Sequence, residues 1–297
     1  MKPLYVFILS SFIFIITHSP IKALDTTVQF KNQRFIPVVT SAGAMYVGSF
    51  VGLNNLWYKE YSSEYFHFFN DDFEWMQMDK AGHFLSAYQI SRISSDVLGW
   101  TGTKRKKAIL YGAGTGLLFQ TTIEVCDGFS SEWGFSVGDM AANTIGSLTL
   151  LSQYLSWNEI RIIPKFSFHS TNYANISPHL LGANFSQQLL KDYNGQTYWL
   201  SFNIRKLTQR DFFWPEWLCA SVGYGADGMV RGSIHESNQA GYSPTRQVYF
   251  SLDVDFQSIH TQSKFLKIIF YAINMLKVPF PTLELINQGV KFHGIYF

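Results

Sequence analysis

Three short polar stripes, set at helical spacing in an otherwise apolar stretch, constrain the fold of this chain more than any other feature. The stretch runs from Asp79 to Gly146. Residues three or four apart lie on the same face of a helix. The members of each stripe therefore share one helix face: Asp79 with His83; Gln120 with Glu124 and Asp127; Ser136 with Asp139, Asn143 and Ser147. Polar stripes on apolar helices predict a helical bundle in which the stripes face one another.

The hydrophobic periodicity predicts a mainly α protein: a bundle of about four helices over residues 37–158, then an α+β region with antiparallel strands over residues 161–297. The four helices are expected over residues 37–57, 79–98, 108–126 and 136–157. Ser136 is a natural N-cap for the fourth helix, with Asp139 at the third helical position, a carboxylate variant of the capping box. Close helix packing is predicted at the glycines of the third helix, Gly112, Gly114 and Gly116.

The second half of the chain changes to a period of two. Residues 197–205 and 247–257 alternate apolar and polar side chains, which predicts half-buried antiparallel strands. The apolar faces of these strands are expected to form a core first and a ligand platform second. Weaker strands are expected over 162–168, 218–224 and 290–297, helices over 178–190 and 263–276, and a glycine-rich loop over 223–232.

Composition limits the class of protein. Charged residues make up 15% of the chain and aromatic residues 17%, with a mean hydropathy of +0.02. These values indicate much buried or lipid-contacting surface. The net charge of +2 is too small to indicate a nucleic-acid partner. Cys126 and Cys219 form no metal motif; two buried free thiols are favoured, and a disulfide between them stays open.

The N-terminus has the pattern of a signal peptide over residues 1–23. Lys2 precedes an apolar run over residues 4–17, and Ala23 is a small residue at a plausible cleavage point. We therefore expect an exported protein, located in the periplasm or in the membrane-associated cell envelope. No cysteine follows the expected cleavage point, so anchoring through a lipidated cysteine is not expected.

The relation to a membrane is less direct. The run over residues 37–57 is long enough to cross a bilayer, but its small residues suit helix packing equally well. Arg92 and Asp96 make the second helix an awkward span. The basic run Lys104–Lys107, most simply a solvated loop, would lie on the exported side, against the positive-inside tendency. A compact bundle that rests on or dips into a membrane is therefore favoured.

The order and spacing of the polar motifs resemble the YfiM-like family of predicted periplasmic proteins, a domain of unknown function. They are more distantly similar to VanZ-like membrane proteins. The resemblance covers about a quarter of the chain and implies a fold and a compartment but no reaction. Family members are often short lipoproteins, and this longer chain departs from that pattern. The residues that carry it are Asp79, Lys80, His83, Phe84, Glu124, Asp127, Trp133, Gly134, Ser136, Asp139, Asn143 and Gly146.

The stripes supply the candidate site. His83, Glu124, Asp127 and Asp139 are the candidate catalytic residues; Asp79, Lys80, Ser136 and Asn143 are the candidate binding residues. Carboxylates with one imidazole suit general acid–base work or a cation such as Mg²⁺, Mn²⁺ or Zn²⁺, although the sequence names no metal or cofactor. The same side chains can instead bond one another and fix the register of the bundle, and this structural network is favoured.

Two functions are carried forward. The first is a non-catalytic envelope protein that binds or organises a membrane-associated partner: membrane lipid, a peptidoglycan precursor or another envelope protein. The alternative is a hydrolase or transferase that acts on an envelope lipid or glycan through the His/carboxylate residues. Whether the protein is an enzyme stays open at this point.

Overall fold

The computed structural model describes residues 30–56, 63–209, 213–286 and 289–296. The predicted signal peptide lies outside the described residues. The chain divides into two compact units. The helical unit comprises the described residues up to Asp71 together with Ser86–Ser156, and the sheet unit comprises Asp72–Leu85 together with the chain from Trp157 onward.

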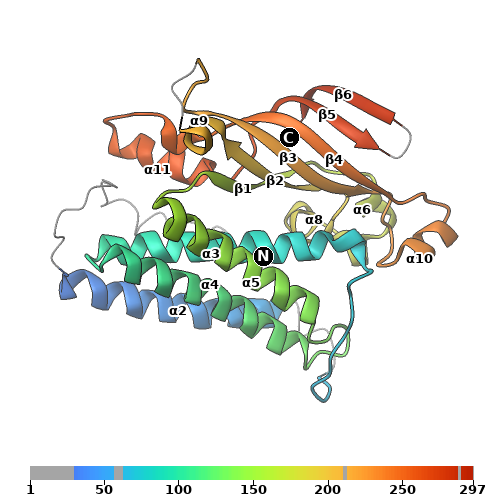
Figure 1. The fold of residues 1–297 in the computed structure, drawn as a ribbon. Helices are drawn as coiled ribbons and strands as arrows, with labels where there is room; N and C mark the ends of the chain where they lie inside the picture. Colours follow the sequence, from blue (N-terminus) through green and yellow to red (C-terminus); the bar gives the residue numbers. More distant parts are fainter. Residues whose placement is uncertain (1–29, 57–62, 210–212, 287–288, 297) are drawn as a thin grey trace. The chain divides into compact units, whose positions relative to one another are not determined.

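The described residues contain four long helices (Figure 1): α2 (Asn32–Leu56), α3 (Met78–Trp100), α4 (Arg105–Asp127) and α5 (Val137–Trp157). The helix α2 begins at Asn32, five residues before the expected start, with Pro37 inside it. The helix α3 is continuous, and its first turns, up to Leu85, belong to the sheet unit.

Helices α3 and α4 approach each other closely where glycines of α4 meet serines of α3. A Cβ atom added at Gly112 would lie 2.5 Å from the backbone nitrogen of Ser95, and one added at Gly116 would lie 2.6 Å from the carbonyl oxygen of Ala87. A Cβ atom added at Gly114 would meet nothing within 4 Å. The structure thus confirms close packing at Gly112 and Gly116 and shows open space at Gly114.

This contrast gives a matched pair of substitutions. Gly116→Ala is expected to lower the free energy of unfolding by about 1–2 kcal/mol, because the new methyl group forces two helix backbones apart. Gly114→Ala is expected to leave stability unchanged or to raise it by up to about 1 kcal/mol, because alanine favours the helix. Thermal unfolding of the two full-length variants measures the difference. Equal melting temperatures would contradict the close contact of α3 with α4.

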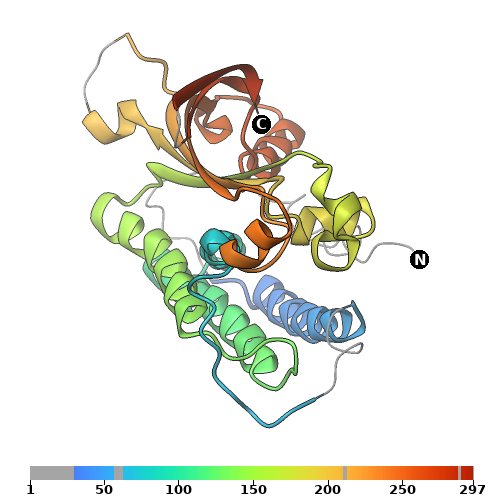
Figure 2. The same ribbon diagram turned by 90° about the vertical axis from the view of Figure 1, so that its right-hand side faces the viewer.

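The sheet unit is built on six antiparallel strands that pair in the order in which they occur along the chain. They are β1 (Ile162–Phe168), β2 (Gln196–Asn203), β3 (Leu218–Asp227), β4 (Thr245–Val254), β5 (Phe280–Ile286) and β6 (Gly289–Tyr296). The sheet is curled (Figure 2), so that the Tyr296 hydroxyl of β6 lies 3.0 Å from Thr197 Oγ1 of β2, a strand that β6 does not pair with.

Short helices fill the connections of this unit: α6 (Tyr173–Ile176), α7 (Pro178–Leu181), α8 (Phe185–Lys191), α9 (Ile204–Thr208), α10 (Ile234–Gln239) and α11 (Lys264–Ile273). Two 3₁₀ turns, η2 (Trp75–Gln77) and η3 (Phe256–Ser258), complete it. The 3₁₀ turn η2 and the start of α3 contribute a small core, in which Met76 and Met78 pack with Ala226 and Met229. The Tyr224 hydroxyl donates a hydrogen bond to the Met76 carbonyl.

Most strands lie where the sequence predicts them, although the predicted strand over residues 197–205 ends at Asn203 and the helix α9 follows it. Other details differ as well. The predicted loop over residues 223–232 is wrong in its first half, because β3 continues to Asp227. The predicted helix over 178–190 is broken at Gly182, whose φ of +100° lies outside the helical region. The strand β5 was not predicted, because Pro281 interrupts its pattern.

The larger correction concerns which face of the sheet is buried. The side chains of Lys165, Trp199, Ser201 and Asp253 point to the concave face and are buried. The apolar face holds Leu200 and Phe250, which are 36% and 43% exposed. The expectation that the apolar faces of residues 197–205 and 247–257 form the core is therefore confirmed only at one end, where Tyr198 packs against Met76 and Met78, and is wrong at Leu200 and Phe250. The polar face is buried along its length.

Charged groups on the concave face are paired. Lys165 Nζ lies 2.9 Å from Asp253 Oδ2, and both side chains are fully buried. Lys206 Nζ lies 2.8 Å from Asp255 Oδ2. The Asn274 side chain donates to Asp255 Oδ1 at 3.3 Å. Such pairing is what allows ionised groups to remain inside a protein.

A further lysine in this interior makes stability depend on pH. The Nζ of Lys277 donates to the carbonyls of Leu252 and Val278, and burial lowers the pKa of Lys277 to about 8. The pKa of a lysine in the unfolded chain is about 10.4. Between pH 8 and pH 10.4 the unfolded chain therefore binds more protons than the folded protein, and the free energy of unfolding rises with pH. We expect the free energy of unfolding of the wild type to increase relative to that of Lys277→Gln between pH 8 and pH 10. A flat difference, measured by denaturant titration, would contradict the burial of a charged Lys277.

Candidate functional site

The polar stripes of the helices meet inside the helical unit. The Gln120 side chain of α4 donates to Asn143 Oδ1 of α5 at 3.2 Å. Ser91 Oγ of α3 donates to Ser147 Oγ of α5 at 3.1 Å. All four side chains are buried. The helical spacing thus predicted faces that do meet, and the polar groups on them bond one another.

The start of α5 is held by three acidic or hydroxyl groups. Ser136 Oγ accepts a hydrogen bond from the Asp139 backbone at 3.0 Å, which confirms Ser136 as an N-cap. The Ser136 backbone donates to Glu124 Oε2 at 3.3 Å. In the predicted capping box the Asp139 side chain would accept the hydrogen bond from the Ser136 backbone. In the structure Glu124 of α4 accepts this bond. Ser136 Oγ also donates to Asp71 Oδ1 at 2.6 Å.

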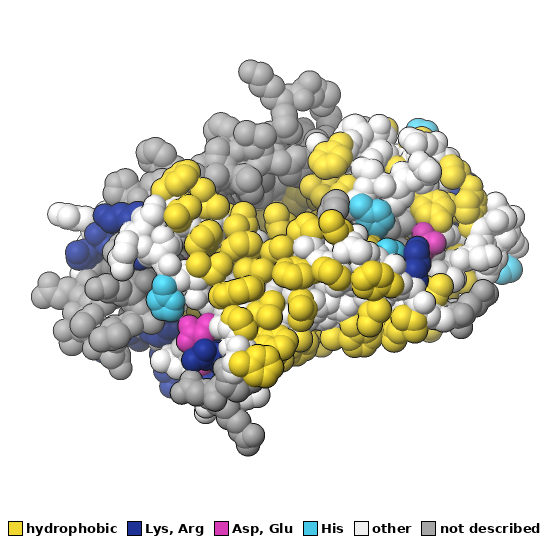
Figure 3. All heavy atoms as spheres, turned by 90° about the horizontal axis from the view of Figure 1, so that it is seen from above, with side chains coloured by type: hydrophobic (Ala, Val, Ile, Leu, Met, Phe, Trp, Pro, Cys, Tyr) yellow, Lys and Arg dark blue, Asp and Glu magenta, His cyan; other side chains and the backbone are white. Residues whose placement is uncertain are grey.

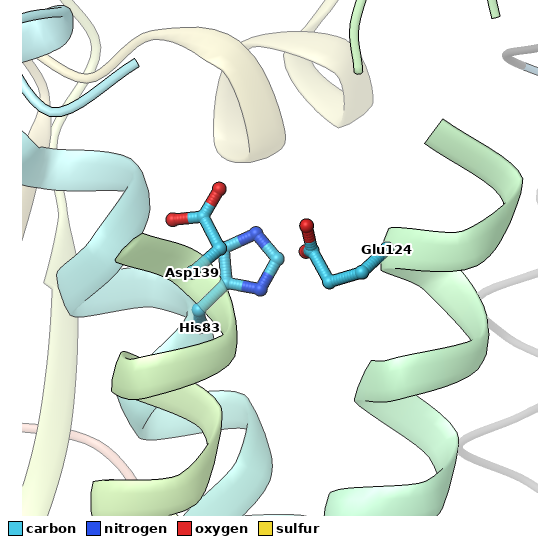
Figure 4. A group of neighbouring side chains, drawn as sticks. All are labelled: His83, Glu124 and Asp139. Carbon is cyan, nitrogen blue, oxygen red and sulfur yellow. The ribbon is translucent and has the colours of Figure 1, made fainter. Parts of the chain in front are cut away.

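One imidazole and two carboxylates converge beside this cap. A ring nitrogen of His83 and one carboxylate oxygen each from Glu124 and Asp139 all lie within 4.8 Å of one another. Figure 4 shows the His83 ring with the carboxylates of Glu124 and Asp139 beside it, each side chain carried by a different long helix. Glu124 and Asp139 are 1% and 5% exposed.

A second group shares Asp139. Carboxylate oxygens of Asp71, Asp79 and Asp139 also lie within 4.8 Å of one another. Lys80 Nζ lies 3.4 Å from Asp79 Oδ2 and 3.8 Å from Asp72 Oδ1, so a cation is already placed at the edge of the acidic groups. Together the two groups contain four carboxylates and one imidazole.

This arrangement suits two kinds of chemistry. An imidazole with two carboxylates is a ligand set suited to a hard or borderline divalent cation, such as Mg²⁺, Mn²⁺ or Zn²⁺. The same three groups, with the imidazole as base and a buried carboxylic acid as proton donor, suit general acid–base catalysis. A protonated His83 between two carboxylates would equally form a structural ion-paired network.

The predicted site residues do not all come together. His83, Glu124 and Asp139 form one group, Asp79 joins Asp139 in the other, and Ser136 and Asn143 bond to members of the stripes. Asp127, the last residue of α4, belongs to neither group. Sequence reasoning missed Asp71, because the aromatic connector that carries it was interpreted as irregular. The pair of aspartates at 71 and 72 was the available signal.

Part of the chain matches a known protein family. Residues 67–154 match a family described as "Predicted periplasmic lipoprotein (DUF2279)", whose function is unknown. The match contains α3, α4, most of α5 and every residue of both carboxylate groups. The periplasm named in this description confirms the predicted location in the periplasm or cell envelope. No curated protein and no solved structure matches the chain.

Proposed function

We propose that this is a cell-envelope protein whose helical unit is embedded in a lipid bilayer, where it binds or organises a membrane-associated partner. The observation that carries the proposal is the reversed polarity of the helices. Their large apolar side chains are outside, and their polar side chains are inside. In water the opposite distribution is favoured by burial of apolar surface.

The outer surfaces of three helices are apolar along their length. The exposed side chains are Ile36, Val39, Val47 and Val51 of α2; Leu110, Tyr111, Leu118 and Val125 of α4; and Val137, Ile145, Leu148 and Leu155 of α5. The interior contains Ser91, Arg92, Ser95, Gln120, Glu124, Asp139, Asn143, Ser147 and Gln153, all buried. Contiguous exposed apolar surface of this extent marks an interaction site.

Length and charge agree with a bilayer. The helix α5 has 21 residues, which span about 30 Å, close to the thickness of the hydrocarbon core. Between Lys107 and Glu124 of α4, and after Asp139 in α5, the sequence has no charged residue. Arg92 of α3 is 1% exposed, so the charge that made this helix an awkward span is enclosed by protein.

One segment, Asn32–Asn54, is the only described helix long and apolar enough by itself to cross a membrane, and 11% of its apolar window is buried. Core helices of soluble proteins and signal sequences also pass that test, so length and composition alone are weak evidence. The helix α2 is mostly exposed, whereas the core helix of a soluble protein is mostly buried. The exposure of its apolar side chains therefore supports embedding in a bilayer.

Aromatic residues lie at both ends of the helices. Phe66 and Phe68 of the connector make edge-to-face contacts with Phe129 and Phe135, which lie in the connection between α4 and α5. At the other end, Trp100 closes α3 and Trp157 closes α5. Aromatic rings at helix ends are typical of the membrane–water interface. We propose that α2–α5 form the four-helix bundle expected from the sequence, with YfiM-like and distantly VanZ-like character.

Paired lysine substitutions on α5 test the embedding. Leu148→Lys places a charge in the middle of the helix, and Val137→Lys places one at its first residue; both positions are exposed, at 52% and 66%. In a bilayer the central lysine costs about 3 kcal/mol and the terminal one far less. We therefore expect Leu148→Lys, and not Val137→Lys, to reduce the protein retained in membranes after an alkaline carbonate wash. Release of the wild-type protein by that wash, or equal behaviour of both variants, would contradict the proposal.

A second function has its own supporting observation. The convergence of His83, Glu124 and Asp139 supports a hydrolase or transferase that acts on an envelope lipid or glycan, with these residues as a cation site or an acid–base set. Elemental analysis of the purified full-length protein tests the cation. Stoichiometric metal in the wild type, retained in His235→Ala and lost in His83→Ala, would support this alternative. Equal metal content in all three proteins would count against it.

A further inference from the structure

The curled sheet has an exposed apolar face of its own, separate from the apolar surfaces of the helices. By strand register, side chains of β2–β6 share this face. Those exposed to at least a third are Leu200, Val222, Phe250, Leu252, Leu283, Leu285, Val290 and Phe292. Figure 3 shows rows of hydrophobic side chains across the middle of the molecule, with charged side chains gathered toward its ends.

Charge is nearly absent from this face. Of the described residues whose register places them on it, Arg246 at the start of β4 is the charged one, and its guanidinium donates to the Tyr224 hydroxyl at 3.1 Å. The middle of the face, around Phe250 and Leu283, has only hydrocarbon and aromatic groups. A surface of this kind is complementary to an uncharged, apolar partner.

One end of the apolar face is covered, because Tyr198 and Tyr224 pack against the core of Met76 and Met78, and the exposed leucines and phenylalanines lie outside that core. The concave face already forms the interior, with Lys165, Asp253, Asp255 and Glu284 all buried there. A sheet that buries ion pairs and presents leucine and phenylalanine outward has the polarity of a protein surrounded by lipid. A protein surrounded by water would reverse these faces.

We propose that the apolar face of β2–β6 contacts the acyl chains of a phospholipid bilayer, so that the sheet unit is a second lipid-contacting surface. The occupant is hydrocarbon because the exposed side chains offer no charge and few polar groups to a protein or glycan. The location in the periplasm or cell envelope supplies a membrane within reach. This inference goes beyond the embedding proposed for the helices and rests on a different set of residues.

Fluorescence quenching by lipids tests the contact at single positions. A bimane label is placed at Leu283→Cys in the full-length protein with Cys126→Ser and Cys219→Ala, reconstituted in vesicles of phosphatidylcholine and phosphatidylglycerol. We expect lipids brominated in their acyl chains to quench this label several-fold more than the same label at Ile234→Cys. Ile234, at 39% exposure, lies on α10 and not on the apolar face. Aqueous iodide should show the reverse order.

The outcomes separate this inference from the embedding of the helices. A third label at Leu148→Cys reports the helical unit. Quenching by brominated lipid at Leu148 but not at Leu283 would overturn the sheet contact and leave the helical proposal intact, whereas quenching at Leu283 alone would support the sheet contact by itself. Protection of Leu283 from both quenchers, with cross-linking between copies at that cysteine, would show that a second copy covers the face and would overturn the inference.

Discussion

Asp253→Ala is expected to lower the free energy of unfolding by about 3–5 kcal/mol, which is a large fraction of the roughly 5–15 kcal/mol that stabilises a typical domain. The substitution removes the carboxylate that lies 2.9 Å from Lys165 Nζ and leaves a fully buried ammonium without its counter-charge. The same carboxylate accepts from the Ser201 hydroxyl and from the Val278 backbone at 3.1 Å. Denaturant titration of the variant in lipid or detergent measures the loss.

Two controls show whether the loss comes from a buried charge. Glu216 pairs with Arg205 at 3.8 Å, and the two side chains are 50% and 35% exposed, so Glu216→Ala should change stability by less than about 1 kcal/mol. The double variant Lys165→Met with Asp253→Leu removes both charges and should be more stable than Asp253→Ala. If Asp253→Ala costs no more than Glu216→Ala, the concave face is wet and is not the interior of the unit.

Glu124→Ala is expected to cost about 2–3 kcal/mol if the His83, Glu124 and Asp139 group is a structural network. The buried carboxylate accepts from the Ser136 backbone, and its removal leaves that donor and His83 with fewer partners. The melting temperature and the amount of protein in the envelope should both fall. Asp127→Ala, at a carboxylate of the same stripe outside the group, is the matched control and should cost less.

The same substitutions separate structure from chemistry. Groups held ready for catalysis or metal binding often cost stability, so their removal would leave stability unchanged or raise it while function is lost. We expect Asp139→Ala to be destabilising, because Asp139 lies in the first turn of α5 beside the Ser136 cap. We expect the same for His83→Ala. A stable but inactive His83→Ala protein would favour the hydrolase or transferase.

Much of the site could be predicted because helical spacing is a local property. The i, i+4 pattern of Gln120 with Glu124 and of Asp139 with Asn143 predicted which side chains share a face, and these faces do meet. The N-cap at Ser136 followed from residue type alone. Asp71 could not be found in this way, because the connector that carries it has no period and its place is set by contacts with residues 128–135.

The burial of the sheet faces could not be predicted for a different reason. Alternation shows that a strand has a polar and an apolar face, but it does not show which face meets solvent. That choice depends on whether the polar groups find partners. Lys165 and Asp253, which satisfy each other, lie on different strands far apart in the sequence. The low share of charged residues, 15%, was the sequence signal that the exterior is apolar.

The division of α3 between two units has a consequence for how the protein is made. The chain crosses between the units three times, after Asp71, after Leu85 and after Ser156, so one proteolytic cut after Ser156 would leave two covalent connections. Met78 also precedes its core neighbour Met229 by about 150 residues, which take on the order of ten seconds to synthesise. Until then the first turns of α3 lack the partners of the finished fold. The synthesis of β3 and of the residues just after it therefore decides when the earliest part of that core closes.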